Sequence, residues 1–365
     1  MLSKMKYYGL KNIMSKEAQY NMIFGERSNG KTFAVLNHGL EKYIKNGEQM
    51  AVIRRWQDDF KGKRASTMFD NIVNAGLVSK LSSGEWNGIF YYASRWYLCR
   101  YEDDKKIVDE KPFAYAFSIS AMEHDKSSSY PNVTTVLFDE FLTRTMYLPD
   151  EFVLFMNVLS TIIRERNNVT VFMCGNAVNQ YSPYFSEMGI VNIKQMKPGD
   201  IDVYEYGDSG LRVAVEFADS PNKGKPSDLY FAFNNPKLSM ITGAGGIWEI
   251  AIYPHCPIKY VPKDIVYTYF IQFSGDILQC EIVQKDDLMF TFIHRKTTEL
   301  KDPDTELIFS PDYDPRTNWR RKLTKPLTSL DKKIAYFYAN DKVFYQDNEV
   351  GEIVRNYLYW CKSGE

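Results

Sequence analysis

Eight residues near the start of the chain have the types and spacing of a phosphate-binding loop. They fit the pattern G-x-x-x-x-G-K-[ST] without a mismatch and run Gly25-Glu26-Arg27-Ser28-Asn29-Gly30-Lys31-Thr32. In such a loop the backbone amides surround phosphate oxygens, and the positive end of the following helix adds to the attraction. We expect Lys31 to reach the β- and γ-phosphates of ATP and the Thr32 hydroxyl to bind Mg²⁺. The other expected nucleotide-binding residues of the loop are Gly25, Arg27, Ser28, Asn29 and Gly30.

The segments on either side of this loop support the same interpretation. Tyr20 to Phe24 is a short apolar run typical of a buried strand, and Phe33 to Lys45 has the spacing of a helix that ends at Asn46-Gly47. A chance glycine loop is the alternative. Strand, loop and helix in this order are the context that a phosphate-binding loop needs, and they favour nucleotide binding.

A second stretch supplies the carboxylates of a hydrolysis site. Thr134 to Phe138 reads as a strand, and it is followed directly by Asp139 and Glu140. We expect Asp139 to hold Mg²⁺, directly or through water, and Glu140 to act as the general base that polarises the attacking water. Taken alone, an apolar run before two acids is weak evidence. Together with the complete phosphate-binding loop upstream, it predicts a site that hydrolyses ATP.

Polar residues also follow the other expected core strands. Val169 to Cys174 is a strand that leads to Asn176, which we expect to sense the γ-phosphate or to align water, although asparagine is also common in turns. Gln49 to Ile53 leads to Arg54 and Arg55. Arginines at the carboxyl end of a strand lie near the ligand edge of an α/β sheet. A solvated strand end remains an equal alternative for these two.

Three arginines are candidates for a finger that completes the site of a neighbouring subunit, since an arginine can stabilise the charge that develops in phosphoryl transfer. They are Arg164, Arg166 and Arg144. A local ion pair with Glu165 or Glu151 is the alternative, and such a pair contributes little at a surface. We rank Arg164 first.

Length and composition limit the remaining possibilities. The chain has 365 residues, of which 44% are hydrophobic and 15% aromatic, enough for two packed domains. The net charge of −1 gives no overall basic surplus, which does not exclude DNA because basic residues can gather on one face. The five cysteines and four histidines are dispersed, as expected for a reducing compartment without a zinc site. No apolar run indicates a membrane span or a signal peptide, so we expect no membrane partner.

Four runs resemble the DNA-packaging ATPases of small phi-29-like podophages. They are Gly25 to Thr32, Arg54-Arg55, Tyr130-Pro131-Asn132-Val133 through Phe138-Asp139-Glu140-Phe141, and Asn176-Ala177-Val178 through Pro183-Tyr184-Phe185. The last two runs are far more specific than general ATPase motifs. The resemblance covers roughly residues 20 to 190, and by it Arg164 is the better match to the finger of that family.

This resemblance implies an α/β P-loop ATPase of the additional-strand class with a mainly parallel central sheet. It implies a homo-oligomeric, pentameric ring in the host-cell cytoplasm that sits transiently at the portal vertex of a procapsid. There it would hydrolyse ATP to push double-stranded DNA inward, and in that family a packaging RNA can mediate attachment. The resemblance also implies an RNase H-like domain at the carboxyl end that has lost its nuclease activity.

We therefore predict three regions: an ATPase domain over 1–200, a linker or lid over 201–256, and an α+β RNase H-like domain over 257–365. The last should open with three antiparallel strands, Val266 to Phe273, Ile277 to Gln284 and Leu288 to His294, and contain helices over Ser329 to Tyr338 and Glu349 to Cys361. Its acids fall mostly in turns, so no nuclease activity is expected. These acids are Asp264, Asp276, Glu281, Asp286 and Asp287.

Smaller features complete the prediction. Asp58 to Val78 reads as one helix, and Glu85 to Val108 reads as a β-insertion. Three basic segments are candidates for contacts, each with a solvated surface as the alternative. DNA is the candidate partner of Lys61, Lys63 and Arg64, and phosphates are that of Lys223-Gly224-Lys225. Nucleic acid or the portal is the candidate partner of a third run, which contains Arg316, Arg320, Arg321, Lys322 and Lys325.

Three functions remain open from the residues themselves. The first is an ATP-driven DNA-packaging motor. The second is another oligomeric motor of the same class, such as a replication helicase or helicase loader. The third is a nucleotide-gated binding module without hydrolysis, against which the adjacent acids Asp139 and Glu140 argue.

Overall fold

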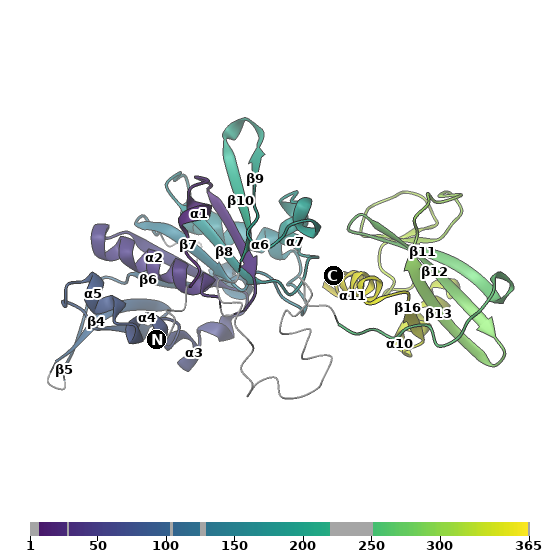
Figure 1. Cartoon of the computed structure of the whole chain (residues 1–365), viewed down its shortest axis with the longest axis horizontal. Helices are drawn as coiled ribbons and strands as arrows, with labels where there is room; N and C mark the ends of the chain where they lie inside the picture. Colours follow the sequence, from purple (N-terminus) through teal and green to yellow (C-terminus); the bar gives the residue numbers. More distant parts are fainter. Residues whose placement is uncertain (1–6, 28, 103–104, 125–128, 220–250, 364–365) are drawn as a thin grey trace, which may run out of the picture. The chain divides into compact units, whose positions relative to one another are not determined.

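The computed structural model describes residues 7–27, 29–102, 105–124, 129–219 and 251–363 (Figure 1). The chain divides into two compact units. One contains Met1–Arg144 and Asp150–Ser227, and the other contains Thr145–Pro149 and Asp228–Glu365.

Within the described residues of the first unit, ten strands form a single sheet. They are β1 (Tyr20–Gly25), β2 (Gln49–Arg54), β3 (Gly88–Tyr92), β4 (Arg95–Glu102), β5 (Lys105–Val108), β6 (Ala114–Ser118), β7 (Val133–Asp139), β8 (Thr170–Asn176), β9 (Ile201–Tyr206) and β10 (Leu211–Ala218). Their order is β3-β4-β6-β2-β7-β8-β1-β10-β9, with β5 paired to β4. The central strands β6, β2, β7, β8, β1 and β10 are parallel, and both margins are antiparallel. Because β8 lies between β1 and β7, the predicted additional-strand α/β class is confirmed.

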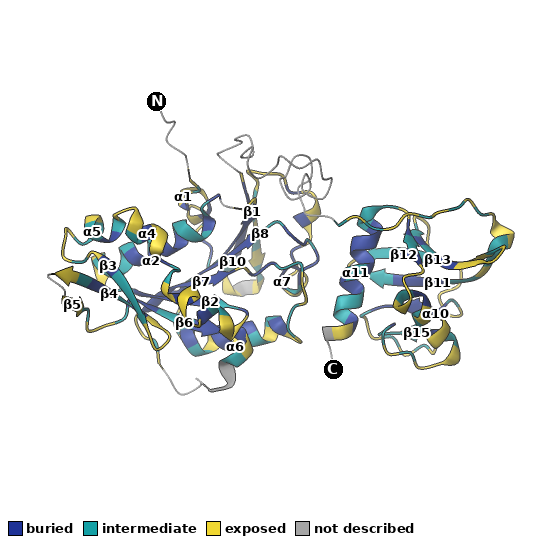
Figure 2. Ribbon diagram, turned by 90° about the horizontal axis from the view of Figure 1, so that it is seen from below, coloured by how far each residue is buried: buried dark blue, intermediate teal, exposed yellow. Residues whose placement is uncertain are grey.

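Helices cover both faces of this sheet. They are α1 (Lys11–Met14), α2 (Lys31–Asn46), α3 (Lys63–Ser66), α4 (Asp70–Asn74), α5 (Leu77–Leu81), α6 (Glu151–Ile163) and α7 (Pro183–Glu187). Adjacent residues of β7 show the two faces: Leu137 joins the core beneath α2, whereas Phe138 stacks on Phe155 of α6 with ring centroids 4.9 Å apart. Figure 2 shows β7, β8 and β1 almost wholly buried, as their continuous apolar sequences require.

The predicted domain boundary at residue 200 is wrong. Strand β10 pairs in parallel with β1, from Tyr20 opposite Val213 to Gly25 opposite Ala218, and β9 pairs with β10. These two strands therefore extend the ATPase sheet beside the phosphate-binding strand. The glycines that suggested a linker over 201–256 include Gly207 and Gly210, which lie in the turn between β9 and β10. Lys223-Gly224-Lys225 lies outside the described residues.

The single helix predicted from Asp58 to Val78 is also wrong. A 3-10 turn, Gln57–Phe60, is followed by the three short helices α3, α4 and α5. Gly62 and Gly76 take positive φ angles of 55° and 68°, which a continuing helix does not allow. The predicted β-insertion over Glu85 to Val108, by contrast, is confirmed as β3, β4 and β5.

Within its described residues, the second unit has its own sheet and two α-helices. Its elements are β11 (Ile265–Phe273), β12 (Asp276–Lys285), β13 (Leu288–Arg295), β14 (Ile308–Phe309), β15 (Trp319–Arg320), β16 (Val343–Tyr345), α10 (Ser329–Ala339) and α11 (Asn348–Ser363). The strand order is β15-β14-β11-β12-β13-β16. The predicted meander of β11, β12 and β13 is antiparallel as expected, and β14 and β15 add in parallel beside β11. A capping box between Thr328 and Asp331 starts α10. Across the residues that the structure describes, no helix combines the length and apolarity that crossing a membrane requires.

Candidate active site

The phosphate-binding loop connects β1 to α2, as its sequence predicts. Gly30 takes a φ of 95°, a left-handed conformation that suits glycine, and α2 starts at the next residue. A Cβ on Gly25 would lie 2.7 Å from the carbonyl oxygen of Ala218, so the neighbouring strand β10 leaves room only for glycine. Ser28 lies outside the described residues, and Arg27 is exposed. The loop thus presents backbone amides at the amino terminus of a 16-residue helix.

Lys31 is buried inside this loop. Its ammonium donates hydrogen bonds to the carbonyl oxygen of Glu26 at 2.7 Å, to that of Gly25 at 3.3 Å and to Oδ1 of Asn29 at 3.1 Å. The side-chain Nδ2 of Asn29 is also buried and has no partner among the described residues. A buried ammonium and an unsatisfied amide donor in one loop fit an anionic ligand such as a triphosphate.

ATP affinity is expected to fall as the pH rises above 8. Burial lowers the pKa of the Lys31 ammonium to about 8. Above that pH Lys31 is mostly neutral in the free protein, so the protein must take up a proton before the lysine can bind a triphosphate as a cation. The γ-phosphate itself is fully ionised above about pH 7.5. The Kd should therefore rise by up to about tenfold per pH unit between pH 8 and 9.5.

Titration of the full-length protein with a fluorescent ATP analogue at a series of pH values measures this dependence. The variant Lys31→Arg is the matched control, because a guanidinium does not lose its proton in this range. A wild-type Kd as flat with pH as that of the arginine variant would contradict the prediction.

Asp139 ends β7 next to the loop and has two partners. Its Oδ1 accepts a hydrogen bond of 2.7 Å from the Thr32 hydroxyl, and its Oδ2 forms an ion pair with Arg54. The carboxylate is only 3% exposed. A hydroxyl and a carboxylate in direct contact beside a phosphate-binding loop are the oxygen donors that Mg²⁺ prefers, so the predicted metal-binding pair fits that ion.

Glu140 follows Asp139 in a different environment. Its φ of 61° is left-handed, and its side chain is 61% exposed, which leaves the carboxylate accessible to water. The nearest cation is Arg54, whose Nη1 lies 3.9 Å from Oε2 of Glu140. Arg54 thus stands between the two acids, and the ligand-edge interpretation of this arginine is supported by its position.

A buried network around Arg55 fixes the turn that carries Glu140. The guanidinium donates to the backbone carbonyls of Glu140 at 3.3 Å and Phe141 at 2.9 Å. It also forms a 2.8 Å ion pair with Glu151, the first residue of α6, which in turn accepts from the Tyr184 hydroxyl at 2.7 Å. Both charged side chains are at most 6% exposed. Three of the runs singled out in the sequence therefore meet at one buried ion pair.

Asn176 lies where the sequence predicts, at the carboxyl end of β8. It pairs in register with Gly25 of β1, and the next amide, that of Ala177, donates to the Gly25 carbonyl at 3.0 Å. The asparagine is thus beside the first residue of the loop and is half-exposed. Its role as a γ-phosphate sensor stays a prediction.

The candidate finger arginines differ in their surroundings. Helix α6 begins at Glu151, near the carboxyl end of β2, and Arg166 just beyond its end contacts the carbonyls of Pro131 and Val133 at the start of β7. The helix therefore runs from the ligand edge of the sheet to the opposite edge. Arg166 also donates to the carbonyls of Ile162 and Ile163, which makes it an anchor for this turn.

Arg164 ends α6 with an exposed side chain at the edge away from its own phosphate-binding loop. This position suits a finger that acts on a neighbouring subunit. Arg144 is half-buried in the segment after Asp139 and Glu140. The structure thus assigns Arg166 a local structural role and leaves Arg164 as our first candidate. The predicted burial of α6 is wrong in part, since Val153 and Met156 are 57% and 38% exposed.

The residues that precede β1 contribute a contact that sequence reasoning missed. The backbone amide of Tyr8 donates to the Asn29 carbonyl at 2.9 Å, and its hydroxyl donates to Glu216 on β10. Burial, followed by the charge of Glu216, raises the pKa of the Tyr8 hydroxyl far above its usual range, so it stays protonated as a donor. This contact joins the loop to β10. The contact between Tyr8 and Glu216 joins residues 208 positions apart, so no local sequence pattern could have revealed it.

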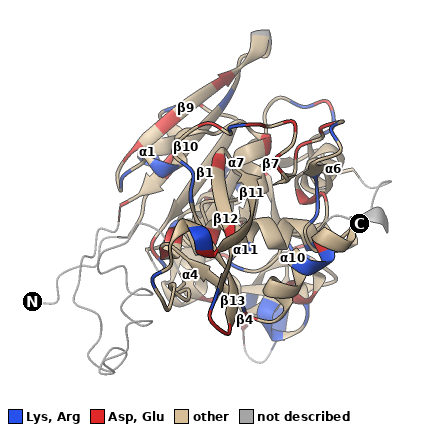
Figure 3. Cartoon of the chain, turned by 90° about the vertical axis from the view of Figure 1, so that its right-hand side faces the viewer, with Lys and Arg blue, Asp and Glu red and all other residues tan. Residues whose placement is uncertain are grey.

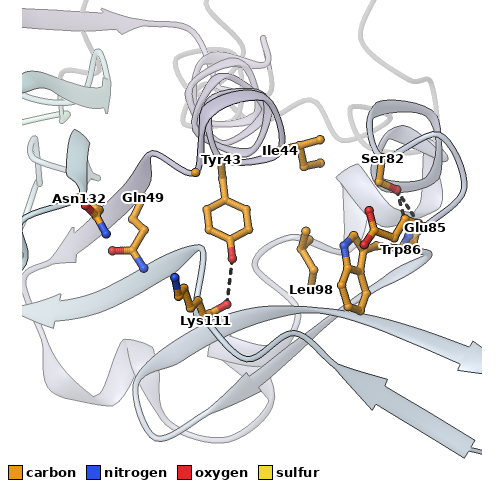
Figure 4. A pocket seen from close by; sticks show the side chains of 10 residues that line it. Tyr43, Ile44, Gln49, Ser82, Glu85, Trp86, Leu98, Lys111 and Asn132 are labelled. Carbon is orange, nitrogen blue, oxygen red and sulfur yellow. Dashed lines mark hydrogen bonds between the residues drawn. The ribbon is translucent and has the colours of Figure 1, made fainter.

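A pocket in the first unit lies at the opposite edge of the sheet from the phosphate-binding loop. It has a volume of about 260 Å³ and is lined by side chains that include Tyr43, Gln49 and Asn132, from the end of α2 and from the starts of β2 and β7 (Figure 4). The Tyr43 hydroxyl shares its proton between Asp109 at 2.8 Å and the Lys111 carbonyl at 3.1 Å, and Figure 4 draws the second of these bonds. None of the predicted nucleotide-binding residues lines this pocket.

The predicted basic clusters are partly neutralised. Lys61 pairs with Asp58 at 2.7 Å, and Arg64 lies 3.7 Å from Asp59. In the second unit, Arg316 pairs with Asp304 and Asp314, and Arg320 pairs with Asp331. Arg321 and Lys322 instead lie over the Trp360 ring, near the end of α11. Lys332 and Lys333 add a separate basic segment on α10 (Figure 3).

One acid of the second unit departs from the sequence-based expectation. Glu281 lies in the middle of β12 and not in a turn. Its carboxylate accepts hydrogen bonds from Tyr260 at 2.6 Å and Gln279 at 2.7 Å, and lies 3.4 Å from Nε2 of His294. Among the described residues, no three His, Cys, Asp or Glu side chains cluster in a way that could hold a metal ion.

Comparison with known proteins agrees with this arrangement. A family model described as podovirus DNA encapsidation protein (Gp16) matches residues 2–83 and 99–230. A DNA packaging protein of Bacillus phage B103 is 29% identical over 182 residues, about half the length of each chain. A DNA packaging protein of Bacillus phage phi29 is 26% identical over 362 residues, which cover 98% of this chain and 97% of that protein.

A solved structure shares the fold. The bacteriophage phi-29 viral genome packaging motor assembly contains a chain with a TM-score of 0.55 and 20% identity, and the match covers 97% of this chain and 98% of that one. The similarity thus extends through both units. Because the family model matches more than half of the residues, the chain belongs to the podovirus DNA encapsidation protein (Gp16) family.

Proposed function

We propose that this protein is an ATP-hydrolysing motor subunit that moves double-stranded viral DNA into a procapsid. The observation that carries the proposal is the contact of Thr32, at the end of the phosphate-binding loop, with Asp139, which directly precedes Glu140. The family membership and the full-length similarity to a phi29 DNA packaging protein support DNA packaging as the work that hydrolysis drives.

Each site residue has a role that its position allows. Lys31 and the loop amides bind the β- and γ-phosphates of ATP, and Asn29 offers a further donor. Thr32 and Asp139 would hold Mg²⁺, which when bound offsets the charge on the phosphates. Glu140 accepts a proton from the attacking water, and Asn176 orients that water or senses the γ-phosphate. Arg54, which pairs with Asp139 in this structure, offsets the charge of that acid.

The active assembly is proposed to be a homo-oligomeric ring, most simply a pentamer, in the host-cell cytoplasm at the portal vertex of a procapsid. Double-stranded DNA is its substrate, the phage portal is its docking partner, and a packaging RNA is a further candidate partner. Support comes from the position of Arg164 at the sheet edge opposite its own phosphate-binding loop, a position that suits action on a neighbouring subunit. We also propose that the second unit is an RNase H-like domain without nuclease activity.

The variant Arg164→Ala is expected to lose ATPase activity in the assembled ring, by about 10³-fold or more, while each subunit still binds ATP. Mixing it with Lys31→Ala subunits should restore part of the activity. In such a mixture, the Arg164→Ala subunit supplies an intact phosphate-binding loop, and the Lys31→Ala subunit supplies an intact Arg164.

Steady-state ATPase assays on defined mixtures of the two variants measure this complementation. Arg64→Ala, which removes an arginine that is 72% exposed in the side chain, is the control and should leave basal activity unchanged. A mixture with no more activity than the sum of its parts would remove Arg164 from the finger role.

The function itself is tested by DNA-stimulated ATP hydrolysis and by packaging of DNA into cognate procapsids. Protection of DNA from added nuclease, dependent on ATP and on procapsids, is the expected result. The runner-up function, a replication helicase or helicase loader, predicts instead the unwinding of forked DNA without procapsids. Unwinding without any packaging would overturn the proposal.

A further inference from the structure

The side chains of the β-insertion, at the margin of the sheet, point to two opposite faces. The pairing of its strands shows which side chains share a face. Phe90 pairs with Tyr97, Tyr92 pairs with Arg95, and Tyr101 pairs with Lys106, so these six side chains lie on the same face of β3, β4 and β5. A Cβ on Gly88 would lie 3.0 Å from the Tyr101 ring, which places that ring over the strand on this face. We call this set the aromatic face.

The opposite face of the same strands forms the core contacts. Trp96 and Leu98 are at most 1% exposed, and the Trp96 indole donates to the Ala65 carbonyl at 2.9 Å. Tyr91, also on that face, packs against Trp96 with ring centroids 5.0 Å apart and donates to the Phe60 carbonyl. Packing of the insertion on the first unit is therefore achieved without the aromatic face.

Two tyrosines of the aromatic face are more exposed to solvent than is usual for large aromatic side chains. Tyr92 is 66% exposed and Tyr101 is 57% exposed, and Figure 2 shows β5 at the surface. The rings of Phe90 and Tyr92 are parallel to within 7°, with centroids 6.3 Å apart. Large aromatic rings exposed on one face of an antiparallel sheet mark a surface that binds a partner.

The charges on this face favour an anionic partner. Among its six residues two are basic, Arg95 and Lys106, and none is acidic. The Lys106 ammonium lies 3.2 Å from the centroid of the Phe90 ring, and the Arg95 guanidinium lies 5.9 Å from that of Tyr115 on β6. Glu102, at the end of β4, points to the opposite face of the strand and pairs with Arg100 at 3.0 Å.

We propose that the aromatic face binds single-stranded nucleic acid, with unpaired bases stacked on Tyr92 and Tyr101 and phosphates held by Arg95 and Lys106. Stacking on sheet-borne aromatic rings with interleaved cations is how proteins bind unpaired bases of RNA or DNA, and it is not available to the paired bases of a duplex. This site is separate from the ATP site, and it adds a nucleic-acid contact beyond the translocated duplex. It does not rest on the proposed motor function.

Fluorescence anisotropy of the full-length protein without nucleotide tests the proposal. The probes are labelled single-stranded RNA, single-stranded DNA and duplex DNA of about 12 nucleotides each, at one salt concentration. The double variant Tyr92→Ala/Tyr101→Ala should weaken single-strand binding by at least about tenfold. Tyr92→Phe/Tyr101→Phe, which keeps the rings, should bind like wild type. Tyr336→Ala, at a tyrosine 51% exposed on α10, is the matched control.

The outcomes are distinct. Loss of single-strand binding in the alanine variant alone, with unchanged ATPase activity, supports the proposal, and a stronger effect on the RNA probe than on the DNA probe identifies RNA as the natural ligand. Equal binding by wild type and alanine variant overturns it. An equal loss on the duplex probe also overturns it, because base stacking is then not involved. Because ATP is absent, failure here is distinguishable from failure of the motor function.

Discussion

Replacement of Glu140 by glutamine is expected to lower kcat for ATP hydrolysis by about 10² to 10⁴-fold, the usual contribution of a positioned general base. The amide keeps the size and the hydrogen-bonding reach of the carboxylate but cannot accept the proton of the attacking water. Binding of ATP should change little, because the phosphates are held by Lys31 and the loop amides. Single-turnover hydrolysis together with equilibrium binding of ATP separates the two effects.

Glu110→Gln makes the same isosteric change at an exposed glutamate and is the control for this experiment. Its kcat should match that of the wild type. Unchanged turnover in the Glu140 variant would remove this residue from the base role. A large loss of ATP affinity would instead show that Glu140 acts in binding.

Removal of the Arg55 guanidinium is expected to destabilise the first unit strongly. Arg55→Met leaves Glu151 buried without its cation, which costs about 3 to 5 kcal/mol in the free energy of unfolding. The double variant Arg55→Met/Glu151→Gln should recover much of that loss, because no unpaired charge remains. Denaturant unfolding of the full chain measures both effects.

The conservative variant Arg55→Lys tests whether Arg55 also positions the catalytic turn. It keeps a positive charge but loses the planar guanidinium, whose separate nitrogens reach Glu151 and the two carbonyls of the Glu140 turn, so this turn loses support. We expect kcat to fall by about tenfold or more with little change in KM. Lys61→Met, which breaks an exposed ion pair with Asp58, is the control and should alter neither stability nor turnover. A stable Arg55→Met protein would contradict the proposed network.

The parts of the site that the sequence predicted are those that depend on neighbouring residues. Gly30 must turn the chain in a left-handed conformation immediately before a helix, and Asp139 must follow an apolar strand. These requirements involve only neighbouring residues, so they can be recognised as motifs in the sequence. The parallel direction of the central strands also follows, because the polar residues that come after these strands must meet at the same edge of the sheet.

The parts that sequence reasoning missed depend on pairing between distant segments. Strand β9 has alternating half-buried and exposed residues, and nothing local shows that β10 pairs with β1 about two hundred residues earlier. Glu151 reads as an acid at a helix start, and its pairing with Arg55 joins positions 96 residues apart. The broken helix after β2 is a different case, since its cause is local: Gly62 and Gly76 lie where the helix is interrupted.

Helix α6 is attached at both of its ends to the strands beneath it. Glu151 is tied through Arg55 to the Glu140 turn, and Arg166 is tied to the carbonyls at the start of β7. A helix of 13 residues is about 20 Å long, so the two attachments define a rigid strut across the sheet. Because such a short helix bends little, a small displacement of the Glu140 turn would also displace Arg164 at the other end of the helix. Under the proposed trans role of Arg164, this helix would couple the state of one ATP site mechanically to the next subunit.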